Sequence, residues 1–173
     1  MRSLLFLFCA LTLGAAEPAA PAKRPNVLMI ISDDHAWFDY GFMGSKAVST
    51  PHLDKLAAES RVFPRGYVPT ALCRPALATF ATGLYAHQHK ISGNDPAGKT
   101  GERGNDLREQ LISHIDKAPT LPHLLATKGY LSLQTGKWWE GNYRRGGFTH
   151  GMTRGFPDKG GRHGDDGLTI GRK

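Results

Sequence analysis

Residues 25–34 read PNVLMIISDD, a continuous apolar run that ends in a serine and two aspartates. A run of this length without polar alternation is typical of a strand buried on both faces of a parallel sheet. In open α/β sheets, ligands bind beyond the carboxyl ends of the strands. The stretch therefore predicts a buried strand over residues 25–31, with Asp33 and Asp34 at its functional end.

Helical and extended segments follow this strand in an order typical of an α/β sandwich. Thr50 is a good N-cap residue before Pro51, and Gly83 and Gly129 are good helix stops. Thr120 is expected to cap a third helix. The expected elements are strands over residues 25–31, 61–67 and 130–134, helices over 52–60, 75–82 and 121–128, and irregular segments over 85–105 and 141–167.

The first 16 residues have the features of a secretory signal peptide. Arg2 precedes the apolar run SLLFLFCALTL, which is too short to span a bilayer, and Gly14-Ala15-Ala16 offers a cleavage site. We expect cleavage after Ala16 and a secreted or periplasmic location, with an uncleaved anchor or a buried core segment as the alternative. Residues 17–24 form a Pro/Ala spacer. Cleavage would leave Cys73 as the one cysteine of the mature chain.

Composition excludes several classes of protein. The 173 residues include 22 Lys and Arg against 15 Asp and Glu, a formal net charge of +7, with 40% apolar residues. These values exclude a disordered polyampholyte, a coiled coil and a polytopic membrane protein. Two cysteines exclude a disulfide scaffold. No nucleic-acid partner is expected, because no recognised motif accompanies the basic charge and the export signal opposes it.

Four residues are candidates for chemistry. Asp33 and Asp34 would repel each other unless a cation such as Ca²⁺ or Mg²⁺ neutralises them; alternatively, one caps a turn and the other faces water. Cys73 is expected just before a helix N-terminus, which favours negative charge, although a buried inert thiol is the alternative. Lys137 follows the strand over residues 130–134 and can reach an anion in the same crevice, or it is a solvated surface lysine.

Two further motifs are weaker. His87 and His89 could bind a transition metal, but no third ligand is implied, so hydrogen-bonded loop histidines are the better interpretation. The stretch His163-Gly164-Asp165-Asp166 has the same status. Residues 93–100 match the phosphate-binding pattern G-x-x-x-x-G-K-[ST]. That pattern needs a buried strand before it and a helix after it, and neither is expected here.

Taken in order, these pieces resemble the sulfatase family of the alkaline-phosphatase-like superfamily. The matching pieces are RPNVL from Arg24 with Asp33-Asp34, STPHLDKLA over residues 49–57, Cys73-x-Pro75 with Thr82-Gly83, and Gly136-Lys137-Trp138. The resemblance implies an alkaline-phosphatase-like α/β sandwich with a mostly parallel central sheet. We expect that sheet to be incomplete in this chain, with residues 25–173 forming the N-terminal part of a catalytic domain.

The resemblance also implies an activity and a site. It implies a sulfuric ester hydrolase that acts on a sulfated carbohydrate or another organic sulfate. Cys73 would be oxidised by formylglycine-generating enzyme to formylglycine, the nucleophile. Asp33, Asp34 and the modified Cys73 would bind Ca²⁺ (or Mg²⁺), and Lys137 would bind the sulfate oxygens.

Two residues depart from the family's pattern. Leu77 stands where the signature C-x-P-x-R has arginine, and Trp139 stands where the family usually has histidine. These departures favour an alternative, a catalytically impaired sulfatase-fold protein that binds sulfated glycans through Arg74, Lys137 and the basic glycine-rich segment. A third possibility is a related phosphoester or phosphonate hydrolase, but those enzymes usually present Thr or Ser in place of Cys73.

Overall fold

The computed structural model describes residues 24–96 and 101–155, with the backbone alone over 101–105. The chain divides into two compact units, Met1–Asp34 and His35–Lys173. The predicted signal peptide, most of the spacer, the His163–Asp166 stretch and the end of the glycine-rich segment lie outside the described residues. No described helix is both long and apolar enough to cross a bilayer.

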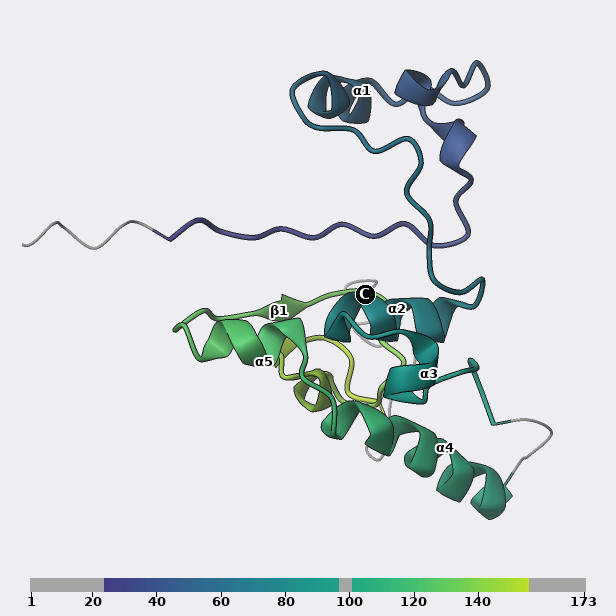
Figure 1. Cartoon of the computed structure of the whole chain (residues 1–173), viewed down its shortest axis with the longest axis vertical. Coiled ribbons are helices and arrows are strands. Elements are labelled where there is room, and N and C mark those ends of the chain that lie inside the picture. Colours follow the sequence, from purple (N-terminus) through teal and green to yellow (C-terminus); the bar gives the residue numbers. More distant parts are fainter. Residues whose placement is uncertain (1–23, 97–100, 156–173) are drawn as a thin grey trace, which may run out of the picture. The chain divides into compact units, whose positions relative to one another are not determined.

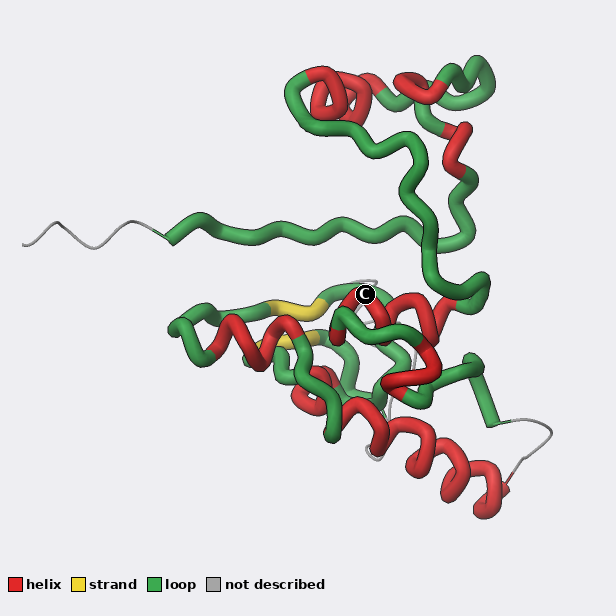
Figure 2. Tube along the Cα trace, in the orientation of Figure 1, coloured by secondary structure: helices red, strands yellow, loops and turns green. Residues whose placement is uncertain are grey.

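The described part of the first unit is an extended segment without regular secondary structure (Figure 2). Leu28 and Ile30 are 84% and 78% exposed, so the buried strand predicted over residues 25–31 is wrong for this structure. The physical reason is that a strand needs backbone partners in a sheet. The sheet of the described residues has two strands, and both belong to the second unit.

The second unit begins with two short 3-10 helices, η1 (Trp37–Asp39) and η2 (Gly41–Met43), and the helix α1 (Pro51–Ala58). Thr50 is the N-cap residue of α1, as predicted, and Pro51 opens the helix. The Thr50 hydroxyl donates to Asp54 Oδ1 at 2.7 Å and accepts from the backbone N–H of Gly41 at 2.8 Å. The cap residue therefore also ties η2 to α1.

Helix α2 (Cys73–Thr82) confirms the helix predicted over residues 75–82, with a start two residues earlier. Gly83 ends it in the left-handed conformation at φ 70°, where a side chain would be strained. The short helix α3 (Ala86–His89) follows and contacts α2. Because α3 lies inside residues 85–105, the irregular segment predicted there is partly wrong.

Helix α4 (Gly101–Asp116) overlaps that same segment and was not predicted. Its first residues are polar and rich in glycine, so the sequence there does not predict a helix. Its second half carries Ile112 and Ile115, which are 1% and 0% exposed. Tertiary burial of this half therefore stabilises a helix whose first half has weak propensity.

Helix α5 (Leu121–Ala126) begins after Thr120, whose hydroxyl accepts from the backbone N–H of His123. The predicted cap is confirmed, although the helix ends before residue 128. Thr120 also donates to the carbonyl of Gly146 at 2.7 Å. A Cβ atom on Gly146 would lie 2.4 Å from the Trp138 ring, so a glycine is needed at this contact. Helix α5 and Trp138 are thereby joined to the 3-10 helix η3 (Tyr143–Gly146).

The sheet consists of β1 (Leu133–Gln134) and β2 (His150–Gly151), paired in parallel with Leu133 opposite His150. The strand predicted over residues 130–134 is thus confirmed for its last two residues. The strand predicted over 61–67 is wrong, since that segment is irregular and Phe63 is 74% exposed. Helices predominate in the described residues, with this small parallel sheet beside α5 (Figures 1 and 2).

The core of the second unit is small and brings distant segments together. Ala78 of α2, Ile91, Ile115 of α4 and Trp138 form its buried cluster, with Ala81 and Phe148 packed against it. The Trp138 and Phe148 rings meet edge to face at 5.4 Å. The residues after β1 are therefore packed directly against α2 and α4.

His89 is a buried polar residue beside this core. Its Nδ1 accepts from the backbone N–H of Ile91 at 3.1 Å, and its Nε2 lies 3.2 Å from the Thr79 hydroxyl. The hydrogen bonding predicted for His89 is confirmed, but the residue lies in helix α3 and not in a loop as predicted. Burial lowers the pKa of His89, the carbonyl of Pro75 opposes this, and the nearby His114 and His87 lower the pKa further. The neutral ring fits the site because Nδ1 must stay unprotonated to accept the Ile91 N–H. Protonation of Nδ1 would place two N–H donors against each other.

We expect acid to destabilise the fold through His89. Its folded pKa lies below the ordinary value of 6.5, so its contribution is complete above about pH 6.5 and is lost as the pH falls toward the folded pKa. Thermal unfolding followed by circular dichroism from about pH 8 to about pH 5 should show a falling Tm. His89→Gln should flatten this slope. The exposed His52→Gln is the control and should leave it unchanged. An equal slope in all three proteins would contradict the assignment.

Candidate functional site

Asp33 and Asp34 end the described part of the first unit, and both are exposed. Asp34 adopts the left-handed backbone conformation at φ 49°, which aspartate tolerates better than most residues. Adjacent carboxylates supply hard oxygen donors, which is the chemistry that Ca²⁺ and Mg²⁺ prefer. The residue types at this chain position therefore fit the predicted cation.

Cys73 is the first residue of α2 and is a half-buried free thiol. It lies in the first turn of the helix, and not before it as predicted. The extended conformation of Leu72 brings the chain into this turn. The next backbone N–H, that of Arg74, donates to Asn94 Oδ1 at 2.9 Å, so a side chain 20 residues away holds this end of the helix.

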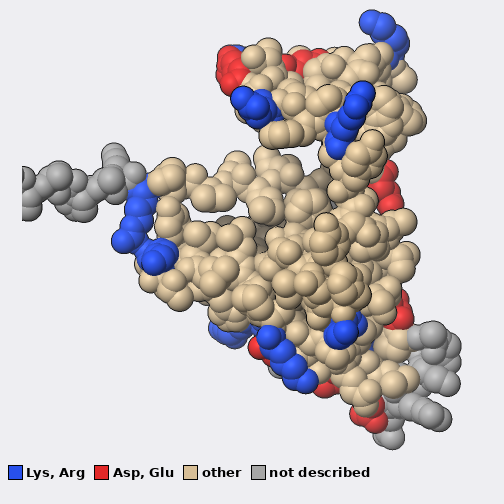
Figure 3. Space-filling view, in the orientation of Figure 1, with Lys and Arg blue, Asp and Glu red and all other residues tan. Residues whose placement is uncertain are grey.

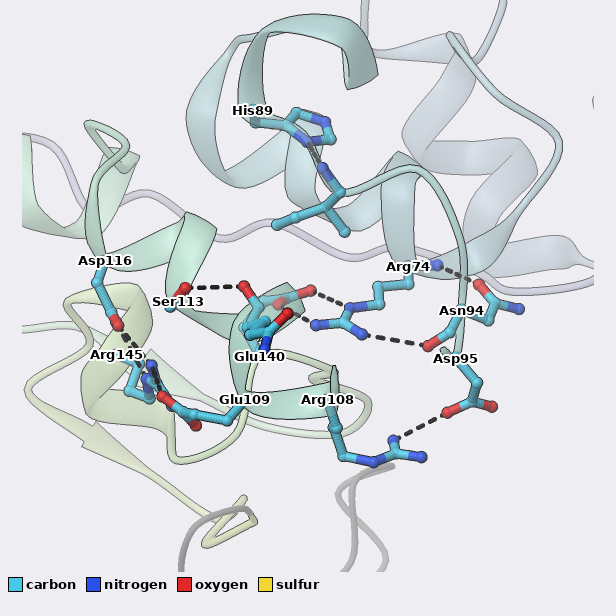
Figure 4. A network of polar contacts seen from close by, with 12 residues as sticks. Arg74, His89, Asn94, Asp95, Arg108, Glu109, Ser113, Asp116, Glu140 and Arg145 are labelled. Carbon is cyan, nitrogen blue, oxygen red and sulfur yellow. Dashed lines mark hydrogen bonds and ion pairs between the residues drawn. The ribbon is translucent and has the colours of Figure 1, made fainter. Parts of the chain in front are cut away.

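The Arg74 side chain turns into the protein and pairs with Glu140 (Figure 4). Its Nε donates to Glu140 Oε1 at 2.7 Å and its Nη2 donates to Oε2 at 2.6 Å, a bidentate geometry. Arg74 and Glu140 are 0% and 1% exposed. The expectation that Arg74 could bind a sulfated glycan is therefore wrong, because its charge is buried and neutralised within the fold.

Burial raises the pKa of Glu140, and the hydrogen bonds and charge of Arg74 oppose this rise. The third guanidinium nitrogen, Nη1, donates to the backbone carbonyl of Asn94 at 3.3 Å. Every guanidinium nitrogen of Arg74 thus has an acceptor. This satisfies the main requirement for a charged pair in a buried position.

Lys137 lies three residues beyond β1 and is half-buried, so the interpretation as a fully solvated lysine does not describe it. Its Nζ lies 5.3 Å from the centroid of the Trp139 ring, within the range of a cation–π contact. Trp139 is 7% exposed. The residue that stands in place of the family's usual histidine therefore presents an aromatic face to Lys137.

A second ion-pair group joins α4 to η3 (Figure 4). Arg145 bonds both carboxylate oxygens of Glu109 and also pairs with Asp116. These hydrogen bonds, first to Asp116 and then to Glu109, raise the pKa of Arg145 above its ordinary value. Sequence reasoning missed this group and the Arg74–Glu140 pair, because partners 29 to 66 residues apart leave no local pattern.

The phosphate-loop pattern over residues 93–100 lacks its preceding strand, since the described residues before it are α3 and an irregular segment. A helix does follow it, because α4 begins at Gly101, so that part of the expectation is wrong. Asp95 pairs with Arg108 of α4 at 2.8 Å. Residues 97–100 lie outside the described part of the chain.

Charge on the visible surface is dispersed. Figure 3 shows Lys and Arg side chains in small separate groups, with Asp and Glu among them. The net charge of +7 therefore does not produce a continuous basic surface on this face of the described residues.

Comparison with known proteins assigns the family. The sulfatase family profile matches residues 25–165. The chain belongs to the sulfatase family. The family implies the alkaline-phosphatase-like fold, of which the described residues form a fragmentary, mostly helical part.

Curated sulfatases resemble this chain over most of its length. Dog N-acetylgalactosamine-6-sulfatase is 36% identical over 141 residues, covering 80% of the chain and 26% of the relative. Bovine arylsulfatase A is 34% identical, covering 83% and 27%, and mouse steryl-sulfatase is 34% identical, covering 84% and 24%. The chain thus spans about a quarter of the length of these sulfatases. No solved structure gives a significant match.

The Arg74–Glu140 pair gives a stability prediction. Glu140→Leu leaves a buried guanidinium without its counter-charge and should lower the free energy of unfolding by about 3–5 kcal/mol. Arg74→Met combined with Glu140→Leu should return it to within about 1 kcal/mol of the original, because apolar replacement of a whole buried pair is often neutral. Urea unfolding would measure both.

The control for this experiment is Arg108→Met, which breaks a partly exposed pair and should cost less than about 1 kcal/mol. If Glu140→Leu costs no more than Arg108→Met, the Arg74–Glu140 pair does not carry the energetic role assigned to it.

Proposed function

We propose that residues 25–173 are the N-terminal part of the catalytic domain of a sulfuric ester hydrolase that uses a formylglycine nucleophile derived from Cys73. The observation that carries the proposal is the placement of Cys73 within the family match, half-buried at the first residue of α2 and two residues before Pro75. A helix N-terminus favours the negative charge of a bound sulfate ester.

The proposed reaction begins with the hydrated aldehyde of the modified Cys73. One hydroxyl oxygen loses its proton as it attacks the sulfur of the ester in line with the departing alcohol oxygen. The S–O bond to that oxygen breaks, and the oxygen takes up a proton from water and leaves as the alcohol. The second hydroxyl then loses its proton and re-forms the aldehyde, which expels sulfate without attack of water at sulfur. Lys137 binds the sulfate oxygens, and the Trp139 face holds its ammonium group.

Asp33, Asp34 and the modified Cys73 are the proposed ligands of Ca²⁺ (or Mg²⁺). When bound, such an ion stabilises negative charge on the transferring group. The carboxylate oxygens are suitable ligands for a hard cation. The two adjacent negative charges repel each other, and a bound cation would neutralise this repulsion.

The proposed substrates are sulfated carbohydrates or other organic sulfates. The curated relatives are named for N-acetylgalactosamine 6-sulfate, aryl and steryl substrates, and their similar identities to this chain favour no one of these. We also propose export through the signal peptide over residues 1–16, which agrees with a substrate outside the cytoplasm.

The second candidate is a sulfatase-fold protein that binds sulfated glycans without cleaving them. Leu77 and Trp139, which replace the family's arginine and histidine, favour it. The burial of Arg74 removes one of the cations on which it depended. Hydrolysis of an aryl sulfate by the protein with its complete catalytic domain would exclude this candidate, and a preference for sulfate over phosphate would exclude a phosphoester hydrolase.

The nucleophile can be tested by mass spectrometry. The chain would be produced together with formylglycine-generating enzyme, and the tryptic peptide of residues 66–90 measured. We expect the mass to fall by the change from a CH₂SH to a CHO side chain, which would show that Leu77 permits the conversion. Cys73→Ser is the control and should keep its unmodified mass. An alkylatable thiol at Cys73 in all molecules would contradict the proposed nucleophile.

Lys137 can be tested in the formylglycine-bearing protein with its complete catalytic domain. Lys137→Ala should lower kcat/KM for an aryl sulfate by about 10²–10³-fold, because the donor acts on charge that develops in the transition state. The exposed Lys128→Ala is the matched control and should retain activity. Equal activity of the two variants would remove Lys137 from the site.

A further inference from the structure

We propose that the buried Arg74–Glu140 pair is a clamp that positions Cys73 relative to Lys137. Arg74 directly follows Cys73, and Glu140 lies three residues after Lys137. The pair therefore joins the two chain segments that carry the nucleophile and the sulfate-binding cation. This inference rests on the proposed function, which assigns those roles to Cys73 and Lys137.

The geometry on the Arg74 side permits little movement. Two parallel hydrogen bonds of 2.6 and 2.7 Å fix the plane of the guanidinium against the carboxylate, as a single contact would not. Asn94 adds two further bonds, one to Nη1 and one to the backbone N–H of Arg74. The peptide unit between Cys73 and Arg74 is therefore held both by its own hydrogen bond and through the side chain.

The Glu140 side is held equally well. Glu140 follows Trp138 and Trp139, which are 4% and 7% exposed, and Trp138 belongs to the core cluster. The Trp139 ring contacts the Lys137 ammonium at 5.3 Å. A fixed Glu140 thus fixes the backbone of Trp139, and the Trp139 ring limits where Lys137 can place its charge.

Burial of the pair favours a positioning role over a purely stabilising one. Desolvation offsets much of the Coulomb energy of a buried ion pair, so apolar side chains of similar size can give equal stability. Apolar side chains cannot reproduce the directional bonds of a bidentate pair. Replacing the pair should therefore leave the protein folded while loosening the separation between Cys73 and residue 137.

A cross-linking experiment tests this separation without requiring activity. The full chain would be made without formylglycine-generating enzyme, with Cys9→Ser and Lys137→Cys, so that Cys73 and the introduced thiol are its two cysteines. A short thiol–thiol cross-linker would join them, and the rate would be followed by mass spectrometry. We expect rapid cross-linking with the clamp intact. The further changes Arg74→Met and Glu140→Leu should slow it about tenfold or more at an unchanged Tm.

Arg108→Met is the control in the same background, since it removes an ion pair between α4 and Asp95 that includes neither Arg74 nor Glu140. It should leave the cross-linking rate unchanged. Equal rates with and without the clamp would overturn the clamp and leave the proposed function standing. No cross-link in any variant would show that residues 73 and 137 do not share a site, and would overturn both.

Activity gives a second measurement. In the formylglycine-bearing protein with its complete catalytic domain, Arg74→Met with Glu140→Leu should lower kcat for an aryl sulfate by about 10²-fold, with full conversion of Cys73 and unchanged Tm. Arg74→Lys keeps the positive charge but cannot form the two parallel hydrogen bonds of the guanidinium, and it should give an intermediate kcat. A kcat that follows Tm alone across these variants would show that the pair only stabilises the fold.

Discussion

The ion pair between Arg74 and Glu140 joins residues 66 positions apart, and neither partner is tolerated alone in a buried site. This constraint couples the first turn of α2 to the segment after β1. The packing of Trp138 against Ala78 and Ile115 depends on the same approach of the two segments. These side-chain contacts therefore hold α2, α4 and the segment after β1 together.

The elements that could be predicted are those with local signals. Thr50 and Pro51, Gly83, and Thr120 mark helix ends through the chemistry of their own residues, and the helices α1, α2 and α5 lie where these residues place them. The start of helix α4 has no comparable capping signal, because it is polar and contains glycine. Burial of Ile112 and Ile115 determines it, and the spacing of these residues was the available signal.

Strands and ion pairs were harder to predict because their partners are distant in sequence. The apolar run over residues 25–31 has the composition of a buried strand, yet a strand also depends on neighbours that the described sheet does not give it. The burial of Arg74 could not be inferred either, since nothing near it indicates Glu140. The candidate residues Asp33, Asp34, Cys73 and Lys137 were identified by residue type and chain position. Their roles came from the family resemblance and stay predictions.

The neutralisation of Arg74 has a consequence for the choice of anion. Because the charge of Arg74 is neutralised inside the fold, Lys137 is the basic side chain among the described residues that the proposed site assigns to the ester, together with a divalent cation. A sulfate monoester carries one negative charge at neutral pH, and a phosphate monoester carries close to two. A cation that is neutralised inside the fold no longer attracts the substrate. Its loss weakens the electrostatic attraction for a dianion more than the attraction for a monoanion. The clamp would thereby bias this site toward sulfate by charge balance alone.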